Sequence, residues 1–165
     1  MSGTSHQNPS FFCLGQDETE GFAAALALRA QAGDLFALTG DLGAGKSTFA
    51  RAFIRAAVGN IEAEVPSPTF TLVQSYSGEN YAIHHADLYR LEGPDDVYDL
   101  ALDEERDDAV LLVEWPDRMP DNWWQDALEI KLVREGGVTE AGDEARRLEF
   151  SGNEARWQIL LEGLL

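Results

Sequence analysis

One stretch of the sequence predicts the class of fold. It reads Leu35-Phe36-Ala37-Leu38-Thr39-Gly40-Asp41-Leu42-Gly43-Ala44-Gly45-Lys46-Ser47. The first five residues form a continuous run that is typical of a strand buried on both faces of a parallel sheet. The run Gly40–Gly45 predicts a glycine-rich turn, and Lys46–Val58 predicts a helix with apolar residues at four-residue spacing on one face. We therefore expect a buried strand, a tight loop and a helix in succession.

The loop between this strand and helix has the pattern of a phosphate-binding loop. Gly40–Ser47 fits G-x-x-x-x-G-K-[ST] at every fixed position. Glycines allow consecutive backbone N–H groups to point at a phosphate, and the following helix adds its positive N-terminal end. Lys46 is predicted to reach the β- and γ-phosphates, and the Ser47 hydroxyl to bind Mg²⁺. A chance match is expected in roughly one such chain in a thousand, so the pattern predicts nucleotide binding.

The composition limits the possible functions. The chain has 165 residues, with 12 Lys and Arg against 30 Asp and Glu, for a net charge of −18. Such a charge repels phosphate polymers, so we expect the chain to bind nucleic acid poorly by itself. The single cysteine, Cys13, excludes an intramolecular disulfide and a site built from several thiolates. No apolar run approaches the roughly 20 residues that span a bilayer, which predicts a cytoplasmic protein with no membrane segment.

The remaining pattern predicts an α/β fold of the P-loop NTPase type, with a mixed β-sheet flanked by helices. A polar leader, expected to be disordered, covers residues 1–10, and one domain covers residues 11–165. Further strands are expected at 11–14, 69–76, 81–86 and 109–113. Helices are expected at about 17–31, with Asp17 or Thr19 as the N-cap, and at 153–164, and a short acidic helix is expected to begin at Gly93. A Pro/Trp loop is expected at 115–125, and a C-terminal antiparallel hairpin at 126–134 and 146–151 around Gly136-Gly137.

An acidic residue at the end of a second strand completes many phosphate-binding sites. Glu114 directly follows the apolar run Ala109–Val113, where such a residue holds Mg²⁺ or its water shell. Because Asp usually fills this place, a Glu favours contact through water or a part in activating water. The alternative is a solvated carboxylate at a strand end, which is common in a chain with 30 acidic residues. The phosphate-binding loop favours the functional interpretation.

Three further groups of polar residues leave more than one interpretation open. Asp87, at the end of another strand, could orient an attacking water or bind the metal, and Arg90 could contact phosphate or pair with an acid. The adjacent His84 and His85 are expected on opposite faces of the sheet, and each alone is more often a core or capping residue than a ligand. The hydroxyl-rich segment Ser67–Thr71 could sense the γ-phosphate or form an ordered turn.

Several classes of nucleotide-binding protein lack support in this sequence. It contains no Asn-Lys-x-Asp to recognise guanine, no Asp-x-x-Gly of a GTPase switch, and no Leu-Ser-Gly-Gly-Gln of transporter ATPases. A small-molecule kinase stays open, although such enzymes usually gather several arginines in a lid and here the arginines are scattered. A module in which nucleotide binding alone changes the affinity for a partner also stays open.

Four motifs occur together in an order that resembles the TsaE (YjeE) family. They are the loop Gly40–Phe49, then Ser67–Val73, His85–Leu91 and Val113–Pro116. The resemblance covers about residues 11–150. It implies a bacterial ATPase that is weakly active alone and is needed for threonylcarbamoyladenosine modification of tRNA. The implied cofactors are ATP and Mg²⁺, and the implied partners are the proteins TsaB and TsaD, through which tRNA is reached indirectly.

The resemblance also implies roles for individual residues. Lys46, Asp87 and Glu114 resemble catalytic residues, and Ser47 and Glu114 resemble the Mg²⁺ site; Ser47 stands where Thr is usual and keeps the hydroxyl. The residues implied to bind the nucleotide are Asp41, Leu42, Gly43, Ala44, Gly45, Lys46, Ser47, Thr48, Thr69 and Trp115.

Overall fold

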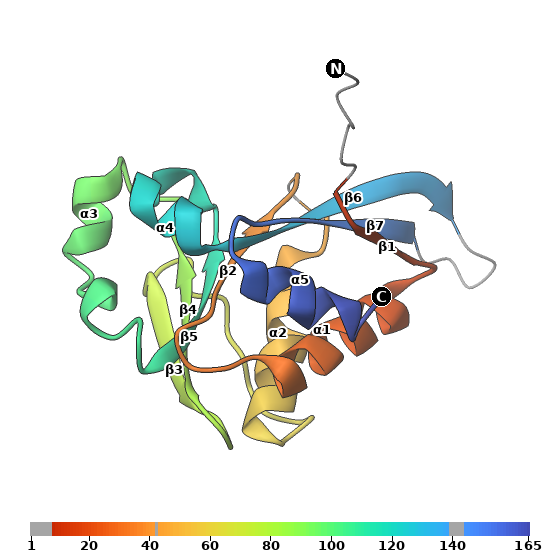
Figure 1. Ribbon diagram of the computed structural model, residues 1–165, viewed down its shortest axis with the longest axis horizontal. Helices are drawn as coiled ribbons and strands as arrows, with labels where there is room; N and C mark the ends of the chain where they lie inside the picture. Colours follow the sequence, from red (N-terminus) through yellow and green to blue (C-terminus); the bar gives the residue numbers. More distant parts are fainter. Residues whose placement is uncertain (1–7, 42, 139–143) are drawn as a thin grey trace.

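The protein is built on one mixed sheet with helices on both sides (Figure 1). The computed structural model describes residues 8–41, 43–138 and 144–165. Across these ranges the order of the seven strands is β1-β7-β6-β2-β5-β4-β3. The strands are β1 (Ser10–Cys13), β2 (Leu35–Thr39), β3 (Val73–Ser77), β4 (Ala82–Asp87), β5 (Ala109–Glu114), β6 (Leu128–Val138) and β7 (Glu144–Ser151). The predicted α/β fold with a mixed sheet is confirmed.

The central strands run parallel and the outer ones antiparallel. Strand β2 is parallel to both of its neighbours, β5 and β6, and β4 is parallel to β5. Strands β3, β7 and β1 each pair antiparallel with the strand beside them. The carboxyl ends of β2, β4 and β5 therefore meet at the same edge of the sheet. The predicted C-terminal hairpin is present as β6 and β7, with β6 continuing through Gly136 and Gly137 to Val138.

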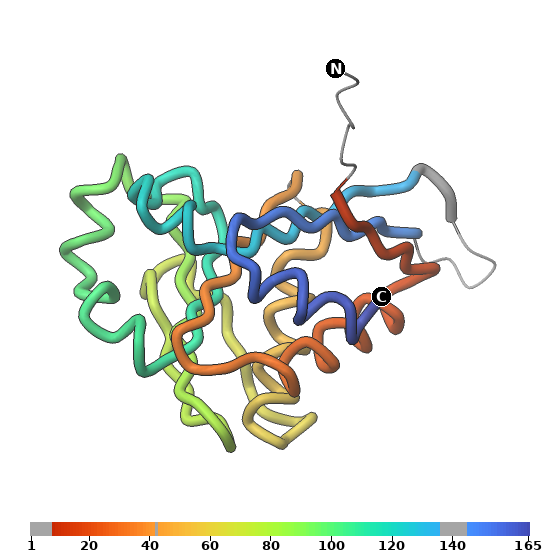
Figure 2. The backbone as a smooth tube through the Cα atoms, viewed as in Figure 1, coloured from red at the N-terminus to blue at the C-terminus, as the bar shows by residue number. Residues whose placement is uncertain are grey.

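Alternate residues of β2 pack into two separate cores. Phe36 and Leu38 pack with side chains of α1, α2 and α5, whereas Leu35 and Ala37 pack with side chains of α3 and α4. Because successive side chains of a strand point to opposite faces, both sides of the sheet are covered (Figure 2). The helices are α1 (Gln16–Arg29), α2 (Lys46–Val58), α3 (Pro94–Tyr98), α4 (Asp121–Asp126) and α5 (Ala155–Glu162).

Residues 115–125 are more regular than the expected loop. Pro116–Arg118 forms a 3-10 turn, and helix α4 follows with Pro120 at its N-cap. Trp123 of this helix is 1% exposed and packs in the core on the α3 side of the sheet. Burial of the indole gives this short helix its stability.

Two other element boundaries differ from the expectation. Helix α1 begins after Gly15 with no side-chain cap, so neither Asp17 nor Thr19 is the N-cap. The strand expected from residue 69 begins only at Val73, because Leu72 has φ +68° and its N–H donates to the Pro68 carbonyl at 2.6 Å, closing a turn. A hydrogen-bonded turn of this kind uses backbone groups that a strand would need for its ladder.

The N-terminal boundary also differs slightly from the prediction. Strand β1 begins at Ser10, and the Phe150 N–H donates to the Pro9 carbonyl at 2.9 Å. The rest of the expected leader, residues 1–7, lies outside the described residues. In the described ranges, no helix has the length and apolar character that crossing a bilayer requires.

Candidate functional site

The loop that joins β2 to α2 has a backbone that only glycine adopts easily. Gly40, Gly43 and Gly45 have φ of +139°, +80° and +109°. A Cβ at Gly40 would lie 2.5 Å from the Leu132 carbonyl oxygen of β6, so a side chain there would also clash with the sheet. Gly45 is the N-cap of α2. The glycines thus place the loop backbone at the positive N-terminal end of the helix.

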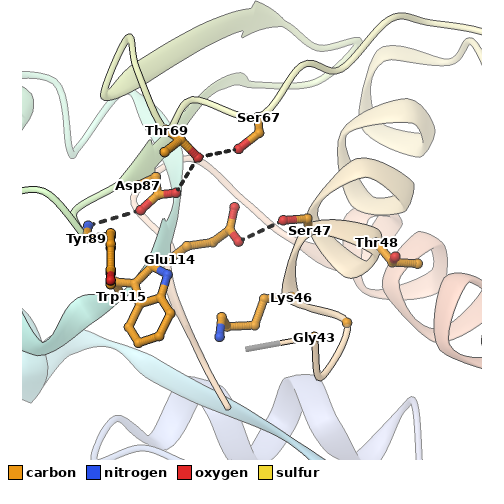
Figure 3. A pocket seen from close by; sticks show the side chains of 11 residues that line it. Gly43, Lys46, Ser47, Thr48, Ser67, Thr69, Asp87, Tyr89, Glu114 and Trp115 are labelled. Atoms are coloured by element: carbon orange, nitrogen blue, oxygen red, sulfur yellow. Dashed lines mark hydrogen bonds between the residues drawn. The ribbon is translucent and has the colours of Figure 1, made fainter. Parts of the chain in front are cut away.

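A cavity of about 570 Å³ lies at the carboxyl ends of the parallel strands (Figure 3). Asp87 of β4 and Glu114 of β5 are partners in the strand register, and Glu114 is also the partner of Leu38 in β2. Ligands of open α/β sheets bind in the crevice at this edge. The lining residues are Gly43, Gly45, Lys46, Ser47, Thr48, Ser67, Thr69, Asp87, Tyr89, Glu114 and Trp115.

Lys46 extends along the inner side of the loop. Its side-chain Nζ donates to the carbonyls of Gly40 at 2.5 Å and Asp41 at 3.3 Å, and it lies 4.2 Å from the centre of the Trp115 ring. Burial lowers the pKa of Lys46 from its ordinary value of 10.5, while the carboxylates of Glu114, Asp41, Asp87 and Asp117 act in the opposite direction. Burial disfavours the charged form of the ammonium group, and an anionic ligand nearby would favour it.

Glu114 is held through both of its carboxylate oxygens. Oε1 accepts a hydrogen bond from the Ser47 hydroxyl at 3.2 Å, and Oε2 lies 2.6 Å from Nε2 of His85. Both His85 and Glu114 are buried, at 2% and 3% exposed. From the sequence alone, His85 is more often a core or capping residue than a ligand. Its even spacing from Asp87, which puts the two side chains on one face of the strand, was the signal that could have found it.

Asp87 connects the sheet to the segment Ser67–Thr71. Its Oδ2 accepts from the Thr69 hydroxyl at 3.1 Å, and its Oδ1 accepts from the backbone N–H of Tyr89 at 3.0 Å. The Thr69 hydroxyl lies 2.8 Å from that of Ser67, which continues the chain of hydroxyls (Figure 3). The hydroxyl-rich segment is therefore attached directly to the carboxylate at the end of β4.

Trp115 has a strained backbone beside this carboxylate pair. Its φ is +55°, in the left-handed region that costs a residue with a side chain roughly 1–2 kcal/mol. The ring centre lies 5.0 Å from that of Tyr89, a residue that is 59% exposed, and the ring covers Nζ of Lys46. Strain of this size persists only where the surrounding contacts hold it, so the indole position is well defined.

Two arginines of the hairpin hold the outer side of the loop. Arg134 of β6 donates to the Gly43 carbonyl at 3.0 Å, and Arg146 of β7 donates to the Ala44 carbonyl at 2.8 Å. Of the loop residues singled out from the sequence, Ala44 is buried in the core, whereas Leu42 lies outside the described residues. Neither arginine was recognised from the sequence, because their distance along the chain from the loop gave no indication of contact.

Arg90 lies at the rim, where its guanidinium carbon is 5.6 Å from the centre of the Phe70 ring. Phe70 is 84% exposed and belongs to the segment that Thr69 attaches to Asp87. The side chain thus stands beside an exposed aromatic ring at the edge of the site.

The donor groups in the cavity suit Mg²⁺ held together with a phosphate. In the part of the chain that the structure describes, no three His, Cys, Asp or Glu side chains gather into a metal-binding group. The Ser47 hydroxyl and the Glu114 carboxylate nevertheless meet beside the loop and offer oxygen ligands. Mg²⁺ is usually bound through one or two carboxylates, several waters and the phosphates of a substrate. The residues present therefore fit this ion.

The fold and the loop together define the class of protein. A glycine-rich loop between a buried parallel strand and a helix, with carboxylates on the adjoining strand ends, is the arrangement of a P-loop NTPase-like α/β protein. A family model described as "Threonylcarbamoyl adenosine biosynthesis protein TsaE" matches residues 14–142. The chain belongs to the TsaE family.

Individual relatives agree with this assignment. A tRNA threonylcarbamoyladenosine biosynthesis protein TsaE from Bacillus subtilis is 37% identical over 149 residues, which cover 90% of this chain and 88% of the relative. The protein of the same name from Rickettsia conorii is 40% identical over 100 residues, which cover 61% of this chain and 57% of the relative. The crystal structure of Bacillus subtilis YdiB superposes with a TM-score of 0.71 at 29% identity, covering 96% of this chain and 94% of that one.

Proposed function

We propose that this chain is an Mg²⁺-dependent ATP-binding and ATP-hydrolysing subunit that supports the proteins TsaB and TsaD in threonylcarbamoyl modification of adenosine 37 of tRNA. The observation that carries the proposal is that Lys46 and Ser47 of the glycine loop share one cavity with Asp87 and Glu114. Membership of the family, whose relatives are named for tRNA threonylcarbamoyladenosine biosynthesis, supports the pathway.

Nucleotide binding is assigned to the loop and Lys46. The ammonium group now contacts two backbone carbonyls and an indole ring. Phosphate oxygens carry a full negative charge and make stronger hydrogen bonds with an ammonium than neutral carbonyls do. Lys46 therefore exchanges these contacts for the β- and γ-phosphates, while the N-terminal end of α2 stabilises the remaining negative charge.

The metal is assigned to Ser47 and Glu114. Bound Mg²⁺ neutralises negative charge on the phosphates during hydrolysis. The Ser47 hydroxyl would hold the ion together with the Glu114 carboxylate, which would bind it directly or through one of its waters. Because Glu114 is 3% exposed, its carboxylate is shielded from solvent and its charge acts strongly within the cavity.

Asp87 is assigned to the attacking water. Two hydrogen bonds, from Thr69 and from the backbone of Tyr89, hold its carboxylate in place. A carboxylate has about four acceptor sites, so it can still accept from a water and orient it towards the γ-phosphate. Glu114 is the other carboxylate in reach of the cavity, and comparison of Asp87→Asn with Glu114→Gln separates the two roles.

Association with protein partners agrees with the charge of the chain. A net charge of −18 disfavours direct contact with tRNA, so the protein reaches the RNA through TsaB and TsaD. The choice of ATP rests on the family resemblance and on the missing guanine-recognition motif.

The decisive experiment measures phosphate release from Mg·ATP by the protein alone and with purified TsaB and TsaD, using Lys46→Ala as the control. We expect the partners to stimulate release and the substitution to abolish it. Phosphate transfer to an added metabolite in place of release would identify a small-molecule kinase. Nucleotide binding with no release in any combination would identify a module that is controlled by binding alone.

A further inference from the structure

His85 is a buried residue at the site to which the proposed function gives no role. It lies on β4 two residues before Asp87, and its Nε2 is 2.6 Å from Oε2 of Glu114. The two side chains are 3% and 4% exposed. Hydrogen bonds to an ionised carboxylate are shorter and stronger than those between neutral groups.

The chemistry of the two groups determines which nitrogen carries the hydrogen. A carboxylate can only accept, so Nε2 of His85 donates to Oε2 of Glu114. No hydrogen-bond partner of Nδ1 lies among the described residues. A neutral ring with its hydrogen on Nε2 leaves one acceptor unpaired. The other neutral form would leave a buried donor unpaired and a carboxylate without a donor, which costs more.

The contact holds the side-chain carboxylate of Glu114 against strand β4. The other partner of this carboxylate is the hydroxyl of Ser47 at 3.2 Å, and Ser47 is an exposed residue. The terminal torsion of a glutamate is broad, so a carboxylate held at one oxygen alone takes a range of orientations. His85 lies in the middle of a paired strand and holds the second oxygen.

We propose that His85 is a positioning residue for Glu114. Its Nε2–H holds Oε2 so that Oε1 stays directed towards Ser47 and the Mg²⁺ that accompanies the nucleotide; this inference rests on the proposed function. Hydrogen-bond partners of metal-ligating carboxylates tune metal affinity, and removing one typically costs about 10–100-fold.

The neighbouring His84 provides a matched control. It lies on the opposite face of β4, where Nδ1 is 2.7 Å from the Ser75 hydroxyl and Nε2 is 2.7 Å from Oε2 of Glu105. It has the same chemistry and the same strand, but its ring nitrogens contact Ser75 and Glu105 instead of Glu114.

The test compares His85→Gln, His85→Asn and His84→Gln. A glutamine amide reaches about as far as Nε2 of histidine, whereas an asparagine amide is too short to contact Oε2. ATP affinity is measured by calorimetry in EDTA and then over a series of Mg²⁺ concentrations. Mg²⁺ is expected to increase the affinity for ATP. We expect His85→Asn to raise the Mg²⁺ concentration that gives half of this increase by about 10-fold or more. Its affinity for metal-free ATP, and all values for His85→Gln and His84→Gln, should stay close to the wild type.

The proposal is overturned if His85→Asn has the Mg²⁺ requirement of the wild type, or if His85→Gln loses as much as His85→Asn. Proton NMR of the nucleotide-free wild type adds a readout that needs neither metal nor ATP. We expect a slowly exchanging downfield signal from Nε2–H of His85, retained in His84→Gln, and its absence overturns the contact itself. If the signal is present but the wild type shows no Mg²⁺-dependent ATP binding, the proposed function is overturned. The role of His85 toward Mg²⁺ is then overturned as well.

Discussion

At the scale of single residues, Lys46 has the clearest predicted effect. Lys46→Met keeps an unbranched side chain and removes the ammonium group, whose Nζ lies 4.2 Å from the centre of the Trp115 ring. Hydrogen bonds from charged groups contribute about 1.5–3 kcal/mol, so we expect ATP affinity to fall by about 10- to 100-fold in calorimetry. Lys131→Met is the matched control, because the only other lysine of the sequence lies exposed on β6. Equal affinities in the two variants would contradict the assignment of Lys46.

Cys13, at the end of β1, makes stability depend on pH in the alkaline range. Burial raises the pKa of its thiol above the ordinary value of 9.0; Glu18 adds to this and a hydrogen bond with Thr19 opposes it. As the pH rises past 9.0, the unfolded chain loses the thiol proton while the folded protein keeps it. The free energy of unfolding therefore falls as the pH rises through this range.

Urea unfolding of the wild type and Cys13→Ala at a series of pH values checks this dependence. We expect the difference in stability between them to shrink steadily above pH 9, because alanine has no proton to lose. Tyr81, whose pKa burial also raises, is present in both proteins and cancels in the comparison. A difference that stays constant with pH would show that the thiol does not ionise differently in the folded state.

At the scale of elements, α4 contributes more to stability than a loop would. Trp123 is 1% exposed, whereas the adjacent Trp124 is only partly buried. Replacing a buried aromatic residue by alanine typically costs about 3–5 kcal/mol, so Trp123→Ala should lower the free energy of unfolding by this amount. Trp124→Ala should lower it clearly less. Similar losses in both variants would mean that the two rings are equally packed.

An ion pair connects helix α5 to Asp34, the residue directly before β2. Arg156 donates to both oxygens of Asp34 at 2.6 Å, and the Gln31 N–H also donates to Asp34 at 2.8 Å. Asp34 is 4% exposed, so Arg156→Ala leaves a buried carboxylate without its cation and should destabilise the protein by about 2 kcal/mol. In an Asp34→Asn background, the same substitution should cost much less in urea unfolding.

Elements that the local sequence specifies could be predicted, whereas elements that depend on distant contacts could not. Strand β2 and helix α2 have the bounds that the sequence predicts, since an apolar run, a glycine loop and a helical face specify them without distant contacts. Helix α4 was missed because burial of Trp123 stabilises it, and the strand at Thr69 began late because Leu72 closes a turn.

The same distinction applies to the candidate site. The loop residues could be predicted from spacing, and Glu114 and Asp87 from their places at strand ends. The contact between His85 and Glu114 depends on β4 lying beside β5 in one register, which is a property of the whole sheet. The arginines that hold the loop, Arg134 and Arg146, depend in the same way on β6 lying beside β2.

At the scale of the whole molecule, the excess of negative charge opposes the compact state. The acidic groups are concentrated in residues 92–108, where Arg106 is the only cation. Most of the acidic side chains there are exposed, so they repel one another through solvent that salt can screen. We therefore expect the thermal unfolding midpoint to rise as KCl is added at neutral pH, in the absence of nucleotide.

A variant of this acidic segment separates general repulsion from other effects of salt. Asp95→Asn, Asp103→Asn, Glu104→Gln and Asp107→Asn together remove four charges from exposed positions that line no part of the nucleotide cavity. The combined variant should have a higher midpoint than the wild type at low salt and a smaller rise with KCl, because less repulsion is left to screen. A parallel rise in both proteins would assign the effect of salt to strengthened burial of apolar surface instead.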